Sequence, residues 1–223
     1  MPLVTYLFFA AALAWCLFWS YRAVQRGWFL LVLVALGSVH CALAARGVYT
    51  NTTSVPPPQF FLLAPVLLAL VVCVALPRGR AWLRSLPLFA LTAVHVLRIP
   101  VELVLHDAYG AGFVPRAMTY DGSNFDILSG ISAALLLPWL RSARPPGRMV
   151  LLAWNFVCVA LLANVVITAV LSIPSSVQRL NFDSPSVLVT AVPWVLLPAV
   201  LVPVVLWAHV AAIVRLFGRE QRD

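Results

Sequence analysis

The sequence has no lysine and few charges of either sign. All 15 basic residues of the 223-residue chain are arginine, seven residues are acidic, and charged residues make up only 10%. A soluble domain typically has about a quarter charged residues. The absence of lysine excludes a retinal-type Schiff base, which needs a buried lysine amine. With 63% hydrophobic residues, the composition excludes an ordinary soluble domain and favours lipid as the solvent.

Cysteines are also scarce, and their spacing is unlike that of a disulfide or zinc protein. Cys16, Cys41, Cys73 and Cys158 lie within apolar runs and form no C-x-x-C pair. We therefore expect them to pack as small apolar residues, and we expect no metal site. The N-terminus lacks the positively charged start of a signal peptide, so we expect the first hydrophobic run to be retained.

Seven apolar stretches follow one another along the chain, and most match the roughly 17–25 residues that cross a bilayer. They lie near residues 3–20, 28–46, 59–77, 86–106, 126–140, 149–172 and 187–214. Pro193, Pro198 and Pro203 interrupt the last stretch, which predicts one kinked helix or two short ones. The sequence therefore predicts an all-α fold, a single polytopic transmembrane helical bundle of about seven helices over residues 1–223.

The arginines are unevenly shared between the two sets of connections. Three occupy one set, Arg46, Arg116 and Arg179. Eleven occupy the other set and the C-terminal tail: Arg22, Arg26, Arg78, Arg80, Arg84, Arg141, Arg144, Arg148, Arg215, Arg219 and Arg222. The positive-inside rule makes the second side cytoplasmic and places the N-terminus outside. Because these charges flank apolar runs, we expect the lipid bilayer as partner and no nucleic acid. The preference for arginine suggests a GC-rich bacterial genome, and hence a multi-pass protein of the bacterial inner (plasma) membrane.

The fourth stretch carries ionisable residues on one face. At about 100° per residue, His95, Arg98, Glu102 and His106 fall within an arc of roughly 80°, and the other face is aliphatic. A charge at the bilayer centre costs at least about 2.5–3.5 kcal/mol, so this face must contact protein or water. Pro100 within the stripe predicts a locally altered helix. We expect Glu102 or His95 to be catalytic and Arg98 and His106 to bind ligand. A purely structural Arg98–Glu102 pair is the alternative.

Other polar residues are expected to join this stripe or to stay apart from it. Counted from the outer ends of their stretches, His40 and Asn164 reach about the same depth as Arg98, roughly 9–12 Å. We therefore expect them to line the same cavity in the outer half of the membrane. His209 and Asn155 lie nearer the cytoplasmic end of their stretches, so an interfacial role and a packing role are expected for them.

Two outer loops end alike, with Asn-Phe-Asp at residues 124–126 and 181–183. Ser123 and Asp126 form a capping-box pattern, and Asp183 precedes Ser184 and Pro185, so helix capping is the simplest expectation for both loops. Alternatively, Asp126 or Asp183 faces a ligand at the outer mouth. The similarity also leaves an internal repeat open, as transporters often have one.

Several segments resemble an uncharacterised group of bacterial multi-pass inner-membrane proteins. They are Arg98-Ile99-Pro100-Val101-Glu102, the run from Met118 to Gly130, and the region from Pro193-Trp194 to His209. The resemblance spans the second half of the chain. It implies membership of a bacterial membrane family and carries no activity.

Three functions stay open at this point. The first is a membrane-embedded enzyme or binding protein for a small or lipid-like ligand, with Glu102 or His95 transferring a proton and Arg98 holding negative charge. The second is a proton-coupled transporter that uses the same residues. The third is a b-type haem protein with His40 and His95 as axial ligands. A non-catalytic accessory subunit is the remaining alternative. No catalytic motif decides whether the protein is an enzyme, and the sequence indicates no particular cofactor.

Overall fold

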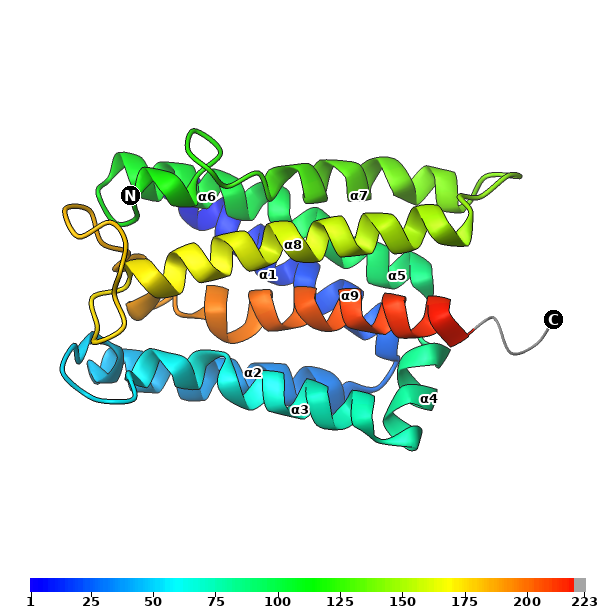
Figure 1. Ribbon diagram of the computed structural model, residues 1–223, viewed down its shortest axis with the longest axis horizontal. Coiled ribbons are helices and arrows are strands. Elements are labelled where there is room, and N and C mark those ends of the chain that lie inside the picture. Colours follow the sequence, from blue (N-terminus) through cyan, green and yellow to red (C-terminus); the bar gives the residue numbers. More distant parts are fainter. Residues whose placement is uncertain (219–223) are drawn as a thin grey trace.

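Long helices run side by side along the longest axis of the molecule (Figure 1). The computed structural model describes residues 1–218 and contains no strand within that range, which confirms the all-α prediction. The helices are α1 (Leu3–Val24), α2 (Gly27–Ala45), α3 (Ala64–Ala75), α4 (Pro77–Ser85), α5 (Leu88–Val94), α6 (Arg98–Gly110), α7 (Ile127–Leu140), α8 (Arg148–Ser172) and α9 (Val202–Phe217). Short 3₁₀ segments join several of them, and a π-helical turn, Leu197–Leu201, leads into α9.

Five helical segments are long and apolar enough to cross a membrane. They are Leu3–Val24, Gly27–Ala45, Leu88–Gly110, Arg148–Ser172 and Leu197–Phe217. A sixth is possible if α3 and α4 count as one broken segment, although the chain bends by 97° between them. The fifth predicted stretch, α7, is apolar but has only 14 residues.

Two of the predicted stretches differ from the structure, and proline explains both differences. The third stretch, 59–77, forms a helix only over Ala64–Ala75, because Leu76 before Pro77 is extended and α4 then leaves at an angle. The last stretch, 187–214, begins with a short 3₁₀ turn at Leu188–Thr190 and further turns. It then forms one continuous helical segment, Leu197–Phe217. Pro193 and Pro198 have no backbone N–H group to donate, so a regular α-helix that began near residue 187 would lack hydrogen bonds at both positions.

Two segments lie at the centre of the bundle and the others surround them. In an 18-residue apolar stretch of each segment, 61% of the residues in Leu88–Gly110 and 67% in Leu197–Phe217 are buried, against 22–33% in the other three membrane-length helices. Side chains on the two central segments are therefore shielded from lipid by protein. Only such positions can hold buried ionisable groups at low cost.

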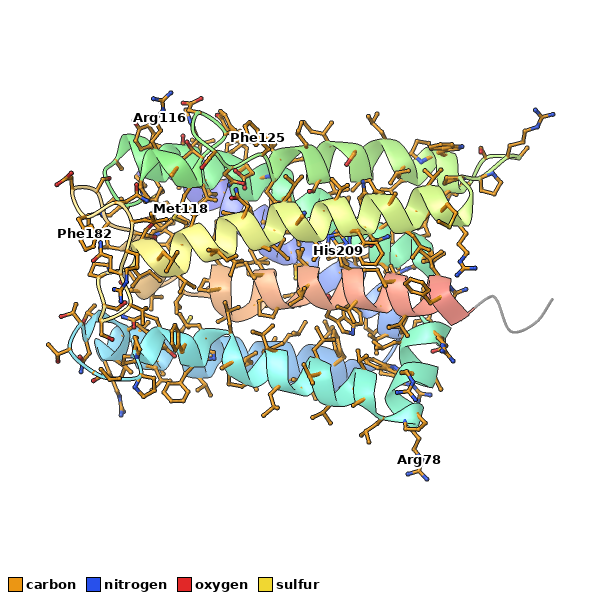
Figure 2. All side chains as sticks on the ribbon, viewed as in Figure 1. Arg78, Arg116, Met118, Phe125, Phe182 and His209 are labelled. Atoms are coloured by element: carbon orange, nitrogen blue, oxygen red, sulfur yellow. The ribbon has the colours of Figure 1, made fainter. Side chains whose placement is uncertain are left out.

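The two ends of the bundle differ in their basic residues. The α1–α2 turn, α4, the α7–α8 connection and the end of α9 lie at one end, while the N-terminus lies at the other (Figure 1). Figure 2 shows Arg78 of α4 at the first end and Arg116 toward the second. The predicted arginine-rich connections thus share one end of the molecule. Arg219 and Arg222 lie outside the described residues.

Candidate functional site

A break in the fourth membrane-length segment sets the position of its ionisable residues. The α5 helix ends at Val94, a 3₁₀ turn spans His95–Leu97, and α6 begins at Arg98. Pro100 cannot donate a hydrogen bond to the carbonyl of Val96, so the regular α-helical ladder is interrupted here. The altered helix predicted from Pro100 is confirmed. His95, Arg98 and Glu102 are all at least 98% buried.

Arg98 is the centre of the site and does not pair with Glu102. Its Nη1 atom donates to Oδ1 of Asp126 at 2.7 Å and to the carbonyl oxygen of Cys158 at 3.3 Å. Its Nη2 atom donates to Nε2 of His209 at 3.2 Å. A structural pair between Arg98 and Glu102 was one expectation from the sequence, and the structure shows a different ion pair. The guanidinium is therefore already neutralised by a carboxylate from a separate part of the chain.

Asp126 reaches Arg98 because the chain before α7 is folded into the bundle. Thr119, Asn124 and Asp126 are buried, and the side-chain oxygen of Asn124 accepts the N–H of Asp126 at 3.0 Å. Non-helical backbone at membrane depth is tolerated only where protein covers it in this way. Gly130 then lets α7 approach closely, since a Cβ atom there would lie 2.8 Å from Cγ1 of Ile99.

The expectation that the Asn-Phe-Asp loops cap helices is wrong in both places. The side chain of Asp126 makes no cap hydrogen bond at the start of α7, because its Oδ1 atom binds Arg98 and accepts from Ser129. Ser123 donates to the carbonyl of Ala117 instead of completing a capping box. After Asp183 no helix begins at residue 185; the chain forms turns until the short 3₁₀ segment at Leu188–Thr190.

Glu102 is held by an amide and not by a cation. The Nδ2 atom of Asn124 donates to both carboxyl oxygens at 2.8 Å and to the carbonyl of Met118 at 3.0 Å. Within the described residues no cation lies within ion-pair distance of Glu102. Two buried carboxyl groups, Glu102 and Asp126, therefore share one buried guanidinium. Protonation of Glu102 would break no ion pair.

His209 lies in the middle of the bundle, so the interfacial role expected for it is wrong. Figure 2 shows it midway along α9, and it is fully buried. The expectation failed because the last helical segment is Leu197–Phe217 and not 187–214, so that its middle lies close to His209. Since a guanidinium only donates, Nε2 of His209 is the acceptor and Nδ1 carries the proton. Nδ1 donates to Oδ1 of Asn155 at 2.8 Å, and Asn155 donates to the carbonyl of Leu151 at 2.8 Å.

These contacts join into one network, which we call the central polar cluster: His95, Arg98, Glu102, Asn124, Asp126, Asn155 and His209. Arg98 lies 12 residues from the outer end of its segment at Gly110, or about 18 Å along the helix. The cluster is thus centred near mid-helix, deeper than the 9–12 Å expected from a helix end at residue 106. Glu102 lies on the outer side of this centre.

His95 packs in the cluster without a hydrogen bond. Its ring stacks on His209 with 3.8 Å between centroids, and Trp154 meets it edge-on at 5.5 Å. Neither ring nitrogen has a partner among the described residues. An axial haem ligand needs a free nitrogen facing an iron plane, with room for the macrocycle. The covered ring of His95 leaves no such room, and His40 is engaged elsewhere, so this pair does not fit a haem.

A cavity of about 110 Å³ ends on the cluster. Its walls come from the 57–63 segment, α6, α8 and the start of the last helix, and most of its lining side chains are aliphatic. Arg98, Glu102 and Asp126 are also among its lining residues, and each is at least 96% buried. Half-exposed apolar side chains stand at its edge, including Leu63, Val166 and Val202. The cavity is therefore a mostly apolar space whose lining includes three buried ionisable residues.

His40 and Asn164, which were expected at the site, lie apart from the cluster. Nδ1 of His40 forms a hydrogen bond with the Tyr49 hydroxyl at 2.5 Å, near the outer end of α2. Asn164 is exposed on α8 and donates to the carbonyl of Ser123 at 2.9 Å. The expectation that His40, Arg98 and Asn164 meet in one cavity is wrong. Equal depth along separate helices does not fix the direction in which side chains point.

His106 lies toward the C-terminal end of α6 and does not line the cavity. Its ring stacks on Tyr120 with 4.7 Å between centroids, and its Nδ1 atom is 3.3 Å from Oδ2 of Asp121. Partial burial and the nearby carboxylates of Asp121 and Asp107 raise the pKa of the Tyr120 phenol, which therefore stays neutral. The ionisable stripe of the fourth stretch is thus divided into three buried groups and one surface group.

A family model matches residues 55–217 of the chain and is described as Domain of unknown function (DUF8737). The chain belongs to this family. The matched region contains every residue of the central polar cluster and confirms the resemblance to an uncharacterised group. Comparisons with curated proteins and with solved structures found no match.

Sequence reasoning missed four residues of the site: Asn124, Asn155, His209 and Gln59. Asn155 was expected only to pack, and Asn124 was expected in a helix-capping loop, although an Asn-x-Asp pair before an unusually short apolar stretch could have suggested a polar segment inside the bundle. His209 was placed by a wrong helix boundary. Gln59, which lines the cavity, lies in a proline-rich segment that carries no motif.

Proposed function

We propose that the chain is a bacterial plasma-membrane protein that crosses the bilayer seven times, with its N-terminus outside. The five membrane-length segments, the broken α3–α4 pair and α7 supply the crossings. The arginine-rich end would then face the cytoplasm, where positive residues concentrate. Reporter fusions at the loops around residues 54, 112 and 144 test this topology. An outside location for residue 144 would contradict it.

We propose further that the cavity binds a small or lipid-like ligand. One observation carries this proposal: an apolar cavity ends on three buried ionisable residues, Arg98, Glu102 and Asp126. Apolar walls with a few convergent polar groups are typical of ligand sites. Ionisable groups inside a membrane protein are by default functional, because lipid makes them costly to keep. The apolar edge of the cavity favours a ligand that enters from the bilayer.

Glu102 is the best candidate for a proton-transfer residue if the site is catalytic. It lines the cavity, and only an amide binds it. His95, the other candidate from the sequence, is covered by two rings and does not line the cavity.

Photolabelling tests ligand binding without assuming a head group. The probes are twelve-carbon chains with a diazirine near the head, carried as an amine, an alcohol and an acid. At least one probe should label peptides from residues 57–63 and 162–177 of the protein in nanodiscs. Ala169→Phe, which fills the cavity wall, should abolish that labelling. Ala163→Phe on the exposed face of the same helix should not. Labelling by none of the probes would refute the proposal.

A transporter is the second candidate, since hydrogen bonds link Glu102 through Asn124 and Asp126 to Arg98, and from there through His209 to Asn155. Uptake into liposomes driven by a pH gradient would support it. A protein that binds the probe but gives no uptake of it under any gradient would exclude it.

A further inference from the structure

The polar residues that line the cavity include more carboxyl groups than cations, and an amide oxygen without a hydrogen-bond donor. Both features indicate which head group a ligand would have. Given the proposed ligand binding, three lining residues bear on the head group: Glu102, Gln59 and Arg98, whose Nη groups are already hydrogen-bonded.

Arg98 keeps one free donor but no unbalanced charge, because its Nε–H has no partner among the described residues while Asp126 pairs with its guanidinium. Asp126 already neutralises it at 2.7 Å, and the carbonyl of Cys158 and the imidazole of His209 accept its other Nη hydrogen bonds. An anionic head group at the Nε–H group would bring a third negative charge beside the carboxyls of Glu102 and Asp126, with one guanidinium to balance all three. Burying a charge without a partner is costly. The sequence-based expectation that Arg98 holds an anionic ligand therefore lacks support in the contacts.

Glu102 is a second buried carboxyl for which the described residues provide no cation. Asn124 donates to both of its oxygens through one amide nitrogen, so each oxygen keeps the capacity to accept another hydrogen bond. With both carboxyls ionised, the site has two negative charges and one guanidinium. A ligand that brings one positive charge to Glu102 would stabilise its ionised form and balance the site.

Gln59 provides an independent indication of a donor. Its Nε2 atom donates to the carbonyls of Tyr49 at 2.7 Å and Asn51 at 3.4 Å, which fixes the orientation of the amide. Its Oε1 atom is buried with no partner in the described chain, and the residue is only 7% exposed. Buried polar atoms without partners are rare and call for an explanation. A donating ligand in the cavity would supply the missing hydrogen bond.

From these observations we infer that the cavity binds an alkyl amine in its protonated form, with the ammonium on Glu102 and the alkyl chain along the aliphatic walls. An ammonium brings one positive charge and several N–H donors, whereas an alcohol brings one donor and a carboxylate none. The cavity, at about 110 Å³, is smaller than a typical site for a whole drug-sized ligand. It admits the head and the first carbons, and the remaining chain lies past the apolar edge.

Competition among chains that differ only in the head tests this inference. The full-length protein in phosphatidylcholine nanodiscs is photolabelled with the diazirine amine, and unlabelled dodecylamine, dodecanol and dodecanoate compete, with empty nanodiscs as background. At pH 7 the amine is protonated. Dodecylamine should compete at a concentration about tenfold or more below the other two, a difference of at least about 1.4 kcal/mol.

Two variants sharpen the test. Glu102→Gln keeps the shape of the side chain and should weaken amine binding about tenfold, removing the preference for amine over alcohol. Asp183→Asn removes one negative charge from the exposed 181–183 loop and should leave the preference intact. The wild-type competition needs no variant, so it decides the question even if Glu102→Gln does not fold.

The outcomes separate the two proposals. Equal competition by dodecanol or dodecanoate would overturn the amine inference while ligand binding stands. An unchanged preference in folded Glu102→Gln would also overturn it. Labelling of the cavity peptides by no probe at all would refute ligand binding itself, and the amine inference with it.

Discussion

The central and surrounding segments of this bundle have similar lengths and similar apolar compositions, but only the central ones contain buried ionisable residues in the cluster. Leu88–Gly110 and Leu197–Phe217 are mostly buried and hold His95, Arg98, Glu102 and His209. The three other membrane-length helices bury a third or less of their residues and present aliphatic side chains outward. Ionisable residues are kept where protein replaces lipid as their neighbour. Perturbing the cluster should therefore have large effects, and perturbing the surface small ones.

The largest effect is expected from breaking the buried ion pair. Arg98→Met leaves Asp126 buried without its cation and should lower the free energy of unfolding by about 3–5 kcal/mol. Adding Asp126→Leu should restore most of the loss, since a buried pair replaced by apolar residues is often neutral. Unfolding in mixed micelles with increasing dodecyl sulfate measures both. Arg46→Met, on the exposed outer connection, is the control. Additive losses in the double variant would contradict the pairing.

The next effect tests how closely α7 approaches the centre. A methyl group at Gly130 would lie 2.9 Å from the backbone nitrogen of Ile99, which cannot move aside alone. Gly130→Ala should therefore destabilise the protein by about 1–3 kcal/mol through overpacking. The matched change Gly110→Ala meets no atom within 4 Å and should be neutral or slightly stabilising. Thermal unfolding compares the two, and equal melting temperatures would refute the close approach.

Two histidines in one stack should respond differently to the same substitution. His209→Phe removes the acceptor for Arg98 and the donor to Asn155, so we expect a loss of about 1–3 kcal/mol. His95→Phe removes no hydrogen bond and should change the free energy of unfolding by less than about 1 kcal/mol. The same micelle unfolding assay measures both. A larger loss for His95→Phe would contradict the assigned hydrogen bonds.

The smallest effect is expected at the outer surface. His106 and Asp121 approach to 3.3 Å, but their side chains are 38% and 45% exposed. Asp121→Asn should therefore change the free energy of unfolding by less than about 1 kcal/mol, because exposed ion pairs are weak and screened. Unfolding measured at low and high salt checks this. A loss comparable to that of Arg98→Met would mean that surface and centre are coupled.

Apolar stretches and the arginine distribution were enough to predict the helical bundle. They were not enough to place helix ends at prolines. Pro77 turns the chain by 97°, and Pro193 and Pro198 delay the last helix to Leu197. Hydropathy averages over a window and does not register one missing N–H group. The error at the last helix carried over to His209, because the predicted bounds 187–214 placed the middle of the segment too early in the chain.

The site was predictable only as far as one helix allows. The 100° spacing correctly grouped His95, Arg98 and Glu102 on a face turned away from lipid. It did not identify partners, since those come from other elements: Asp126 from the chain before α7, Asn124 from the same segment, and His209 from the last helix. Contacts between elements depend on helix rotation and on close approach at positions such as Gly130, which one sequence does not specify.

The short length of α7 has a consequence for the surrounding bilayer. Fourteen helical residues rise about 21 Å, against about 30 Å of hydrocarbon, and the chain on the outer side of Ile127 is polar and non-helical. Acyl chains beside this helix must shorten or tilt to avoid the exposed polar side chains of Asp121 and Ser123. We therefore expect a local thinning of the leaflet on the Ile127 side of α7, and a preference of the protein for thinner membranes.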